Sequence, residues 1–124
     1  MAELSPVNIA LIEGLRRGGL AYRTAYRRTR QGKPSWEIRP DDITGFLRTT
    51  RRGSSRQAVV QAKDGAIRVR WMTPLEYTQL MGAGDFNLDG LPRNQALCGF
   101  GDAVCVPVVE RLAENYLLSL VTTR

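Results

Sequence analysis

The spacing of apolar residues along the first part of the chain predicts one helix followed by a strand. Four apolar residues recur at helical intervals near the N-terminus, namely Val7, Ala10, Leu11 and Leu15. Ser5 and Pro6 precede them as a hydroxyl N-cap and a proline at the first helical position, and Gly18-Gly19 ends the run. Residues 21–28 then alternate roughly between polar residues and small or aromatic ones, which predicts a strand.

The middle of the chain has shorter and weaker patterns. Residues 31–34 contain Gly and Pro and predict a turn or loop. Residues 36–39 are a short extended candidate, and residues 43–47 are a second one. Residues 48–56 are polar and basic with no apolar period, so they predict a loop.

A β-hairpin is the strongest local prediction. Residues 57–62 and 66–71 have the composition of two strands, and Asp64-Gly65 between them is a typical two-residue hairpin turn. The second strand alternates apolar residues with Arg68 and Arg70. One face of the hairpin is therefore expected to be apolar and the other basic.

Two helices are predicted after the hairpin. Thr73, Pro74 and Glu76 form a capping box around a proline at the first helical position, and Gly82 ends that short helix. Residues 83–92 read as a loop. The last helix is expected from about Ala103 to Leu120, with one apolar stripe formed by Cys105, Val108, Val109, Leu112, Tyr116 and Leu120. The predicted fold class is α+β, with short antiparallel strands from about residue 20 to residue 71 followed by a C-terminal helical tail.

Charge separates the two halves of the chain, whose 124 residues suit one small domain. Residues 1–60 hold 12 Lys/Arg and 5 Asp/Glu, a net charge of +7, whereas residues 61–124 have a net charge of −1. Eleven of those 12 basic residues are Arg, which binds phosphate and guanine edges in a bidentate manner. This distribution favours a polyanion partner, and the alternative is a basic surface that only interacts with solvent.

Several classes of chemistry are excluded by missing residues. The chain has no His, which removes His-based nucleophilic catalysis and the commonest metal ligand. Cys98 and Cys105 lack a Cys-x-x-Cys or His partner, so we expect no metal site and read both as small apolar residues in a reducing compartment. No P-loop or dinucleotide-binding glycine motif occurs. No apolar run is long enough for a membrane span and no export signal is visible, so the expected location is cytoplasmic.

Two segments resemble motifs of the DNA cytosine-5 methyltransferases. Residues 70–77 read RWMTPLEY and continue to Leu80-Met81-Gly82, which resembles the ninth motif, Arg-x-Leu-Thr-x-x-Glu followed by an apolar pair and Gly. Residues 99–108 read GFGDAVCVPV, similar to the tenth motif, Gly-Asn-x-Val followed by an apolar helix. Residues 26–57 resemble the end of the family's target-recognition domain, where a Leu-x-Thr segment leads into a basic, Gly-containing loop. The resemblance covers about residues 20–120.

The resemblance implies roles for named residues. Residues 1–72 would be a target-recognition-like basic region, and residues 73–124 would complete a methyltransferase domain. The tenth motif would place Asp102, Ala103 and Val104 near S-adenosylmethionine at a helix N-terminus, although Asp102 stands where the family has Asn. The plainer interpretation is that Asp102 is only the N-cap of the last helix. The expected contacts to double-stranded DNA come from the basic loop: Arg48, Arg51, Arg52, Ser54, Ser55 and Arg56.

The residues that perform catalysis in this family are missing. The chain has no Pro-Cys nucleophile loop, no Glu-Asn-Val motif and no Gly-rich cofactor turn, so it has no catalytic residues and should be inactive alone. It starts with Met and a capped helix, which favours a genuine start. The first interpretation is the small subunit of a split methyltransferase, which recognises DNA and completes the cofactor site of a catalytic partner chain. The alternatives are a methyltransferase-derived DNA-binding or regulatory protein and an inert gene remnant.

Overall fold

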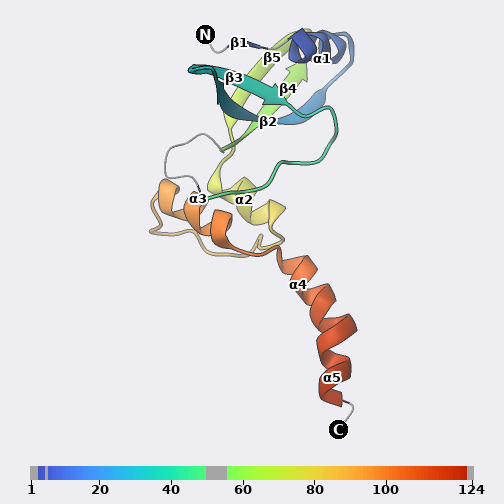
Figure 1. Cartoon of the computed structure of the whole chain (residues 1–124), viewed down its shortest axis with the longest axis vertical. Helices are drawn as coiled ribbons and strands as arrows, with labels where there is room; N and C mark the ends of the chain where they lie inside the picture. The colour runs from blue at the N-terminus through green and yellow to red at the C-terminus, as the bar shows by residue number, and fades with distance from the viewer. Residues whose placement is uncertain (1–2, 5, 50–55, 123–124) are drawn as a thin grey trace. The chain divides into compact units, whose positions relative to one another are not determined.

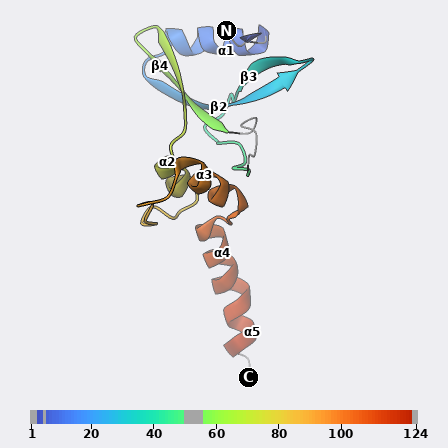
Figure 2. The same ribbon diagram turned by 90° about the vertical axis from the view of Figure 1, so that its left-hand side faces the viewer.

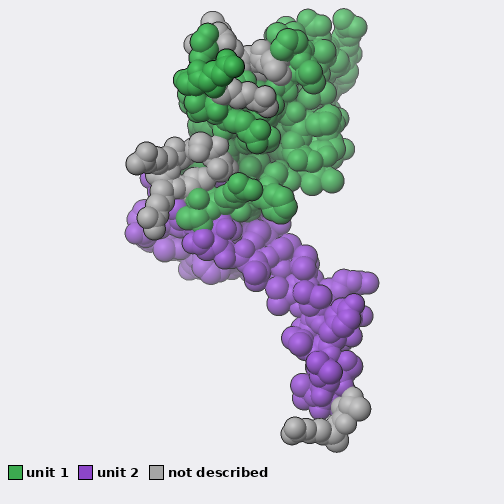
Figure 3. Space-filling model, viewed as in Figure 1, with its two compact units in different colours: residues 1–72 green, residues 73–124 purple. Residues whose placement is uncertain are grey.

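The computed structural model describes residues 3–4, 6–49 and 56–122. The chain divides into two compact units, Met1–Met72 and Thr73–Arg124, which Figure 3 colours separately. Unit 1 contains a β-sheet and one helix, and unit 2 is helical in the residues described. The predicted α+β class is confirmed.

The sheet of unit 1 has five strands in the order β1-β3-β2-β4-β5 (Figure 1). These strands are β1 (Glu3–Leu4), β2 (Ala21–Arg30), β3 (Lys33–Ile38), β4 (Gln57–Lys63) and β5 (Ala66–Trp71). The two-residue β1 runs parallel to β3, and all other neighbours are antiparallel. The predicted extended segment at residues 43–47 is wrong, because those residues form no strand.

Both hairpins close with two-residue turns whose residues have positive φ. Asp64 and Gly65 have φ values of 50° and 74° between β4 and β5, which confirms the predicted hairpin. Gln31 and Gly32 have φ values of 49° and 76° between β2 and β3. The turn predicted over residues 31–34 is therefore shorter than expected, and β3 already begins at Lys33.

Helix α1 (Pro6–Arg17) covers one face of the sheet (Figure 2). Under it lies a core of four buried residues and the partly buried apolar residues packed on them: Ala25, Ile38, Ala58 and Val60, with Leu11, Ile12, Trp36, Ile67 and Trp71. The rings of Trp36 and Trp71 have centroids 4.9 Å apart. The apolar face predicted for the hairpin is thus confirmed at Ile67 and Trp71, whereas Val69 is 43% exposed.

The buried side of α1 differs from the predicted stripe. Val7 is 78% exposed, while Asn8 is buried. The Asn8 Nδ2 donates to the Trp36 carbonyl at 2.7 Å, and its Oδ1 accepts from the Ile38 amide at 3.2 Å. Because β1 pairs only with Ser35 and Trp36 of β3, the Asn8 amide satisfies backbone groups where that pairing ends. A polar residue therefore joins the helix to the sheet edge.

Unit 2 is built from α2 (Pro74–Leu80), α3 (Arg93–Asp102), α4 (Val106–Leu112), the π-helical η1 (Ala113–Leu117) and α5 (Leu118–Thr122). The predicted capping box is confirmed: the Thr73 Oγ1 accepts from the Glu76 amide, and the Glu76 carboxylate accepts from the Thr73 amide. The buried residues of this unit are Tyr77, Thr78, Met81, Ala96, Leu97 and Phe100. Phe86 packs edge-on against Phe100 with ring centroids 5.8 Å apart.

The last three helical elements follow one another without a break from Val106 to Thr122. The predicted helix start at Ala103 is wrong, because Ala103 and Cys105 are extended and α4 begins at Val106. Helix α3 was not predicted at all. In the part of the chain that the structure describes, no helix combines the length and apolarity needed to cross a membrane.

Candidate nucleic-acid interface and cofactor segment

The sheet of unit 1 has a second face, opposite the α1 core. Strand alternation and register place these residues on it, here called the polar face: Tyr22, Thr24, Tyr26, Arg28, Lys33, Ser35, Glu37, Gln57, Val59, Gln61, Lys63, Arg68 and Arg70. Among them, five side chains are basic and only Glu37 is acidic. The predicted basic face of the β4–β5 hairpin therefore extends across β2. Such a face suits a polyanion.

A hollow at the β5 side of the polar face combines polar and basic residues. It is lined by Tyr22, Val59, Gln61, Arg68, Val69 and Arg70. The Gln61 Nε2 donates to the Tyr22 hydroxyl at 3.0 Å, and Tyr22 is half exposed. This hydrogen bond holds an aromatic ring next to basic side chains on the sheet surface.

A larger concentration of charge and aromatic rings lies at the β2–β3 side. We call it the Tyr26–Phe46 pocket; it has a volume of about 550 Å³ and is lined by Tyr26, Arg28, Thr29, Arg39, Gly45, Phe46, Arg48 and Gln57. The Arg28 guanidinium carbon is 5.6 Å from the centre of the Tyr26 ring. The Phe46 side chain is 84% exposed. The pocket thus combines three guanidinium groups with two aromatic rings.

Backbone and buried side chains fix the segment that carries Phe46. Gln57 is 4% exposed, and its Nε2 donates to the Phe46 carbonyl at 3.3 Å. A Cβ at Gly45 would lie 3.0 Å from the Gln57 Oε1, so this glycine allows the close approach. Further back, the Thr24 Oγ1 donates to the Ile43 carbonyl at 3.0 Å. The position of Phe46 is therefore set by contacts that do not involve its own ring.

An ion pair borders the same segment. Arg39 donates to both carboxylate oxygens of Asp41 at 2.7 Å. The Arg39 hydrogen bond lowers the pKa of Asp41 below its ordinary value, and the same hydrogen bond raises the pKa of Arg39. Arg39 is consequently compensated by Asp41, which leaves Arg28 and Arg48 as the pocket cations that do not bind this carboxylate.

The residues predicted to contact DNA are only partly described. Arg48 lines the Tyr26–Phe46 pocket, and Arg56 immediately precedes β4 and is half-buried. Arg51, Arg52, Ser54 and Ser55 lie outside the described residues. Of the residues that line this pocket, the sequence prediction named only Arg48, and Tyr26, Arg28 and Phe46 are among those it missed. The alternation of β2 could have identified the first two, since i and i+2 share a strand face.

The predicted cofactor segment has a different local structure from the one expected. Asp102 is the last residue of α3, Ala103 is its C-cap, and Val104 is 68% exposed in the connection to α4. The interpretation of Asp102 as the N-cap of the last helix is wrong, because Cys105 has that position. Asp102 therefore does not lie at a helix N-terminus. The first amide of α4, that of Val106, already donates to the Met81 carbonyl at 2.9 Å.

The two motif-like segments contact each other within unit 2. The hydrogen bond from Val106 to Met81 joins the start of α4 to the end of α2. Gly82 has a φ of +69°, and a Cβ there would lie 2.3 Å from the Pro107 Cδ. The backbone conformation at Gly82 therefore allows the close approach of a segment some 25 residues further along the chain.

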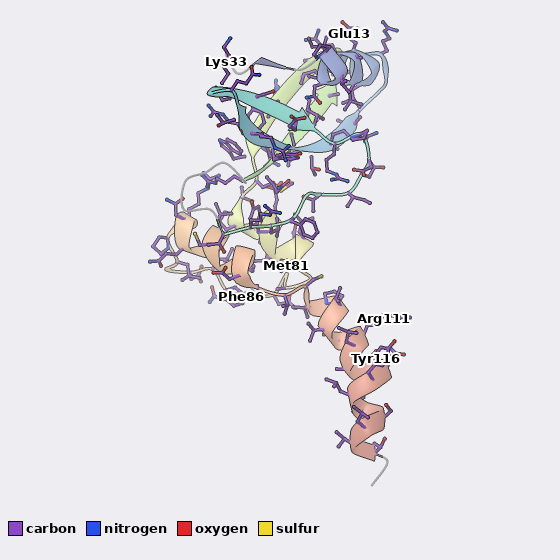
Figure 4. The ribbon with its side chains drawn as sticks, viewed as in Figure 1. Glu13, Lys33, Met81, Phe86, Arg111 and Tyr116 are labelled. Carbon is purple, nitrogen blue, oxygen red and sulfur yellow. The ribbon has the colours of Figure 1, made fainter. Side chains whose placement is uncertain are left out.

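The helical segment Val106–Thr122 has no buried residue. Most of its apolar side chains are well exposed, including Val108 at 55%, Leu112 at 50%, Tyr116 at 65% and Leu120 at 74%. Figure 4 labels Arg111 and Tyr116 on this segment. Val108, Leu112 and Tyr116 also line a shallow hollow. Within unit 2 the predicted stripe therefore does not contribute to a core.

Metal and thiol chemistry gain no support from the described residues. No group of three or more His, Cys, Asp and Glu side chains that could hold a metal ion occurs among residues 3–4, 6–49 and 56–122. Cys98 and Cys105 are half-buried thiols in α3 and at the N-cap of α4.

Comparison with protein-family models, curated proteins and solved structures found no match to this chain.

Proposed function

We propose that this chain is the non-catalytic, DNA-recognising subunit of a split DNA cytosine-5 methyltransferase. The observation that carries the proposal is the contact between the two motif-like segments, in which Met81 and Gly82 lie against Val106 and Pro107. Residues 73–82 of the segment that resembles the ninth motif and the whole segment that resembles the tenth thus belong to one compact unit. That unit continues into a helix whose apolar side chains are exposed, as expected for a fragment that completes another chain.

DNA recognition is assigned to unit 1. Its sequence holds 15 Lys/Arg and 6 Asp/Glu, a net charge of +9, whereas the sequence of unit 2 holds 3 and 6, a net charge of −3. Neutralising DNA phosphates releases counterions, which supplies affinity that falls as salt rises. The polar face and the Tyr26–Phe46 pocket provide basic side chains for this role, and the protein would act in the cytoplasm, where DNA and partner are both present.

Docking to the catalytic chain is assigned to unit 2. The exposed stripe that contains Val108, Leu112, Tyr116 and Leu120 suits a helix-in-groove interface. Asp102, Ala103 and Val104 are exposed just before this helix and offer one carboxylate and two small apolar side chains. That set fits one wall of an S-adenosylmethionine site, with the other walls on the partner. S-adenosylmethionine supplies the methyl group, and the partner supplies the nucleophile.

The test uses a partner defined by its sequence. A suitable partner is a chain of the same genome that has a Pro-Cys loop and a Gly-rich cofactor turn and ends before the ninth motif. We would co-express the two chains, purify them through a tag on one, and measure transfer of labelled methyl groups to DNA. Activity in the mixture, with none from either chain alone, is expected. Full activity of the partner alone would contradict the proposal.

A second candidate function is a DNA-binding or regulatory protein that never methylates. The net charge of +9 on unit 1 favours this second function, because the charge does not depend on unit 2. In the same experiment it would appear as DNA binding by this chain without an active complex. A complex that forms but inhibits its partner would also favour this function over the first.

A further inference from the structure

We infer that the Tyr26–Phe46 pocket binds one unpaired nucleotide of a DNA strand. The base would lie against the rings of Tyr26 and Phe46, and its phosphate would bind Arg28 and Arg48. The inference rests on the proposed DNA-binding function and specifies the form of DNA that this surface prefers.

The size and lining of the pocket match a nucleotide. A volume of about 550 Å³ lies within the range of small-molecule sites. Aromatic side chains stack on any base, and guanidinium groups bind phosphate through charged, bidentate hydrogen bonds. Both kinds of group line this one pocket, all of it within unit 1. A phosphate alone would need the arginines but not the rings.

The exposure of Phe46 is the feature that points to a base. The side chain is 84% exposed, whereas its backbone is held by buried Gln57 and by the close approach at Gly45. The backbone that carries this ring has therefore lost freedom before any ligand arrives, so ordering the segment on binding costs less entropy. Ile43, on the same segment, is also exposed at 65% but does not line the pocket.

Whether a base is paired determines whether the rings of Tyr26 and Phe46 can stack on it. A base inside a duplex is stacked on both faces by its neighbours, so a side chain cannot reach its face unless the base leaves the stack. An unpaired base avoids most of that cost.

Two carboxylates lie close enough to oppose a phosphate. Glu37 is the cross-strand partner of Tyr26 on the polar face, and Asp41 is bound by Arg39. Because Asp41 is already compensated by Arg39, the phosphate is assigned to Arg28 and Arg48, the two pocket arginines that do not bind that carboxylate.

The experiment compares two forms of one DNA. Fluorescence anisotropy at low salt would measure binding of the full chain to a short paired duplex and to the same duplex with one bulged 2-aminopurine. We expect about tenfold tighter binding to the bulged form, the size of one base–aromatic stack. The 2-aminopurine emission should fall on binding, because stacking quenches it.

Matched variants identify the pocket. Phe46→Ala should remove both the tighter binding to the bulged duplex and the quenching of the 2-aminopurine emission. Ile43→Ala should keep both. Arg28→Gln should weaken binding of the bulged form more than Arg17→Gln does, since Arg17 is on α1, on the other side of the sheet. A thermal melt of each variant checks folding.

The outcomes separate this inference from the proposed function. Equal binding of the two DNA forms by the unmodified chain, or an unchanged preference in folded Phe46→Ala, would overturn the pocket assignment and leave DNA binding intact. Absence of binding to either form would overturn both.

Discussion

The two units of this chain expose opposite kinds of surface. In unit 1 the apolar residues of sheet and helix form a core in which Ala58 and Val60 are at most 1% exposed, and the remaining sheet face is polar and basic. In unit 2 a small core around Tyr77 and Phe100 leads into a helix with no buried residue. Their net charges are +9 and −3.

This difference is consistent with the two proposed partners, which differ in their chemistry. A basic face next to a complete core gains free energy by binding a polyanion without any change of its own fold. An exposed apolar helix gains by burying its surface against an apolar groove, at about 25 cal/mol per Å² removed from water. Variants that affect one unit should therefore leave the other unit's stability and binding unchanged.

The largest expected effect is the loss of stability of unit 2 in Gly82→Ala. Alanine at a φ of +69° is strained, and its Cβ would lie 2.3 Å from the ring of Pro107, which cannot rotate away. Strain and overpacking together should cost about 2–4 kcal/mol of unfolding free energy. Urea unfolding followed by far-UV circular dichroism should show this, because most helical residues belong to unit 2.

Tryptophan fluorescence provides the control signal, since Trp36 and Trp71 are the only tryptophans and both belong to unit 1. Their transition should not move in Gly82→Ala. Gly84→Ala is the matched variant: its Cβ would meet nothing within 4 Å, and we expect a change within about 0.5 kcal/mol. A shift of both signals in Gly82→Ala would show that the units unfold together.

The next effect concerns binding rather than folding. Leu112 is 50% exposed and lines the hollow on the C-terminal helix, so Leu112→Asp should leave the thermal stability of the isolated chain unchanged. At an interface with the catalytic chain it would place a charge in an apolar contact and weaken binding by about 2 kcal/mol, or roughly 30-fold. Isothermal titration would measure the affinity.

Glu114→Gln on the same helix is the control, because it changes charge away from the apolar stripe. A folded Leu112→Asp chain with unchanged affinity would assign the helix surface another role. Loss of stability without any partner would instead show that the helix face is buried in the isolated chain.

Sequence patterns predicted the parts of the fold that depend on local rules. The β4–β5 hairpin needs only the Asp64-Gly65 turn and strand alternation, and α2 needs only its capping box. Helix α3 escaped prediction because Gly99 and Gly101 weaken its helical propensity and its first residue follows Pro92 without a side-chain cap. It forms because Ala96, Leu97 and Phe100 pack into the unit 2 core.

The candidate site was harder to predict because it depends on register. The basic composition indicated a polyanion surface, but the pocket brings Tyr26 and Arg28 of β2 together with Phe46, which lies in no regular element. The part-buried hydrogen bond from Gln57, the close approach at Gly45 and the hydrogen bond from Thr24 to Ile43 place Phe46 there. Gln57 and Phe46 are 11 residues apart and belong to no common helix or strand pattern, so their contact could not be predicted from a single sequence.

A test of unit 1 alone comes from Asn8. Asn8→Ala removes a donor to the Trp36 carbonyl and an acceptor for the buried Ile38 amide, so it should cost about 1–2 kcal/mol. Urea unfolding followed by tryptophan fluorescence measures it, and Val7→Ala, at an exposed neighbouring position, should change little. Equal effects of the two variants would mean that the polar bridge between helix and sheet edge does not stabilise unit 1.

The smallest effect should come from the half-exposed ion pair between Arg39 and Asp41 beside the pocket. Because Arg39 lowers the pKa of Asp41, ionised Asp41 contributes stability above the ordinary carboxyl pKa, and that contribution is lost as pH falls through the lowered value. Asp41→Asn should therefore have a slightly lower melting temperature than the unmodified chain near neutral pH. This difference in melting temperature should disappear in acid. Glu13→Gln, at an exposed carboxylate on α1, should show a smaller difference in melting temperature. A difference that widens in acid would contradict the assignment, because protonating Asp41 can only weaken its bond to Arg39.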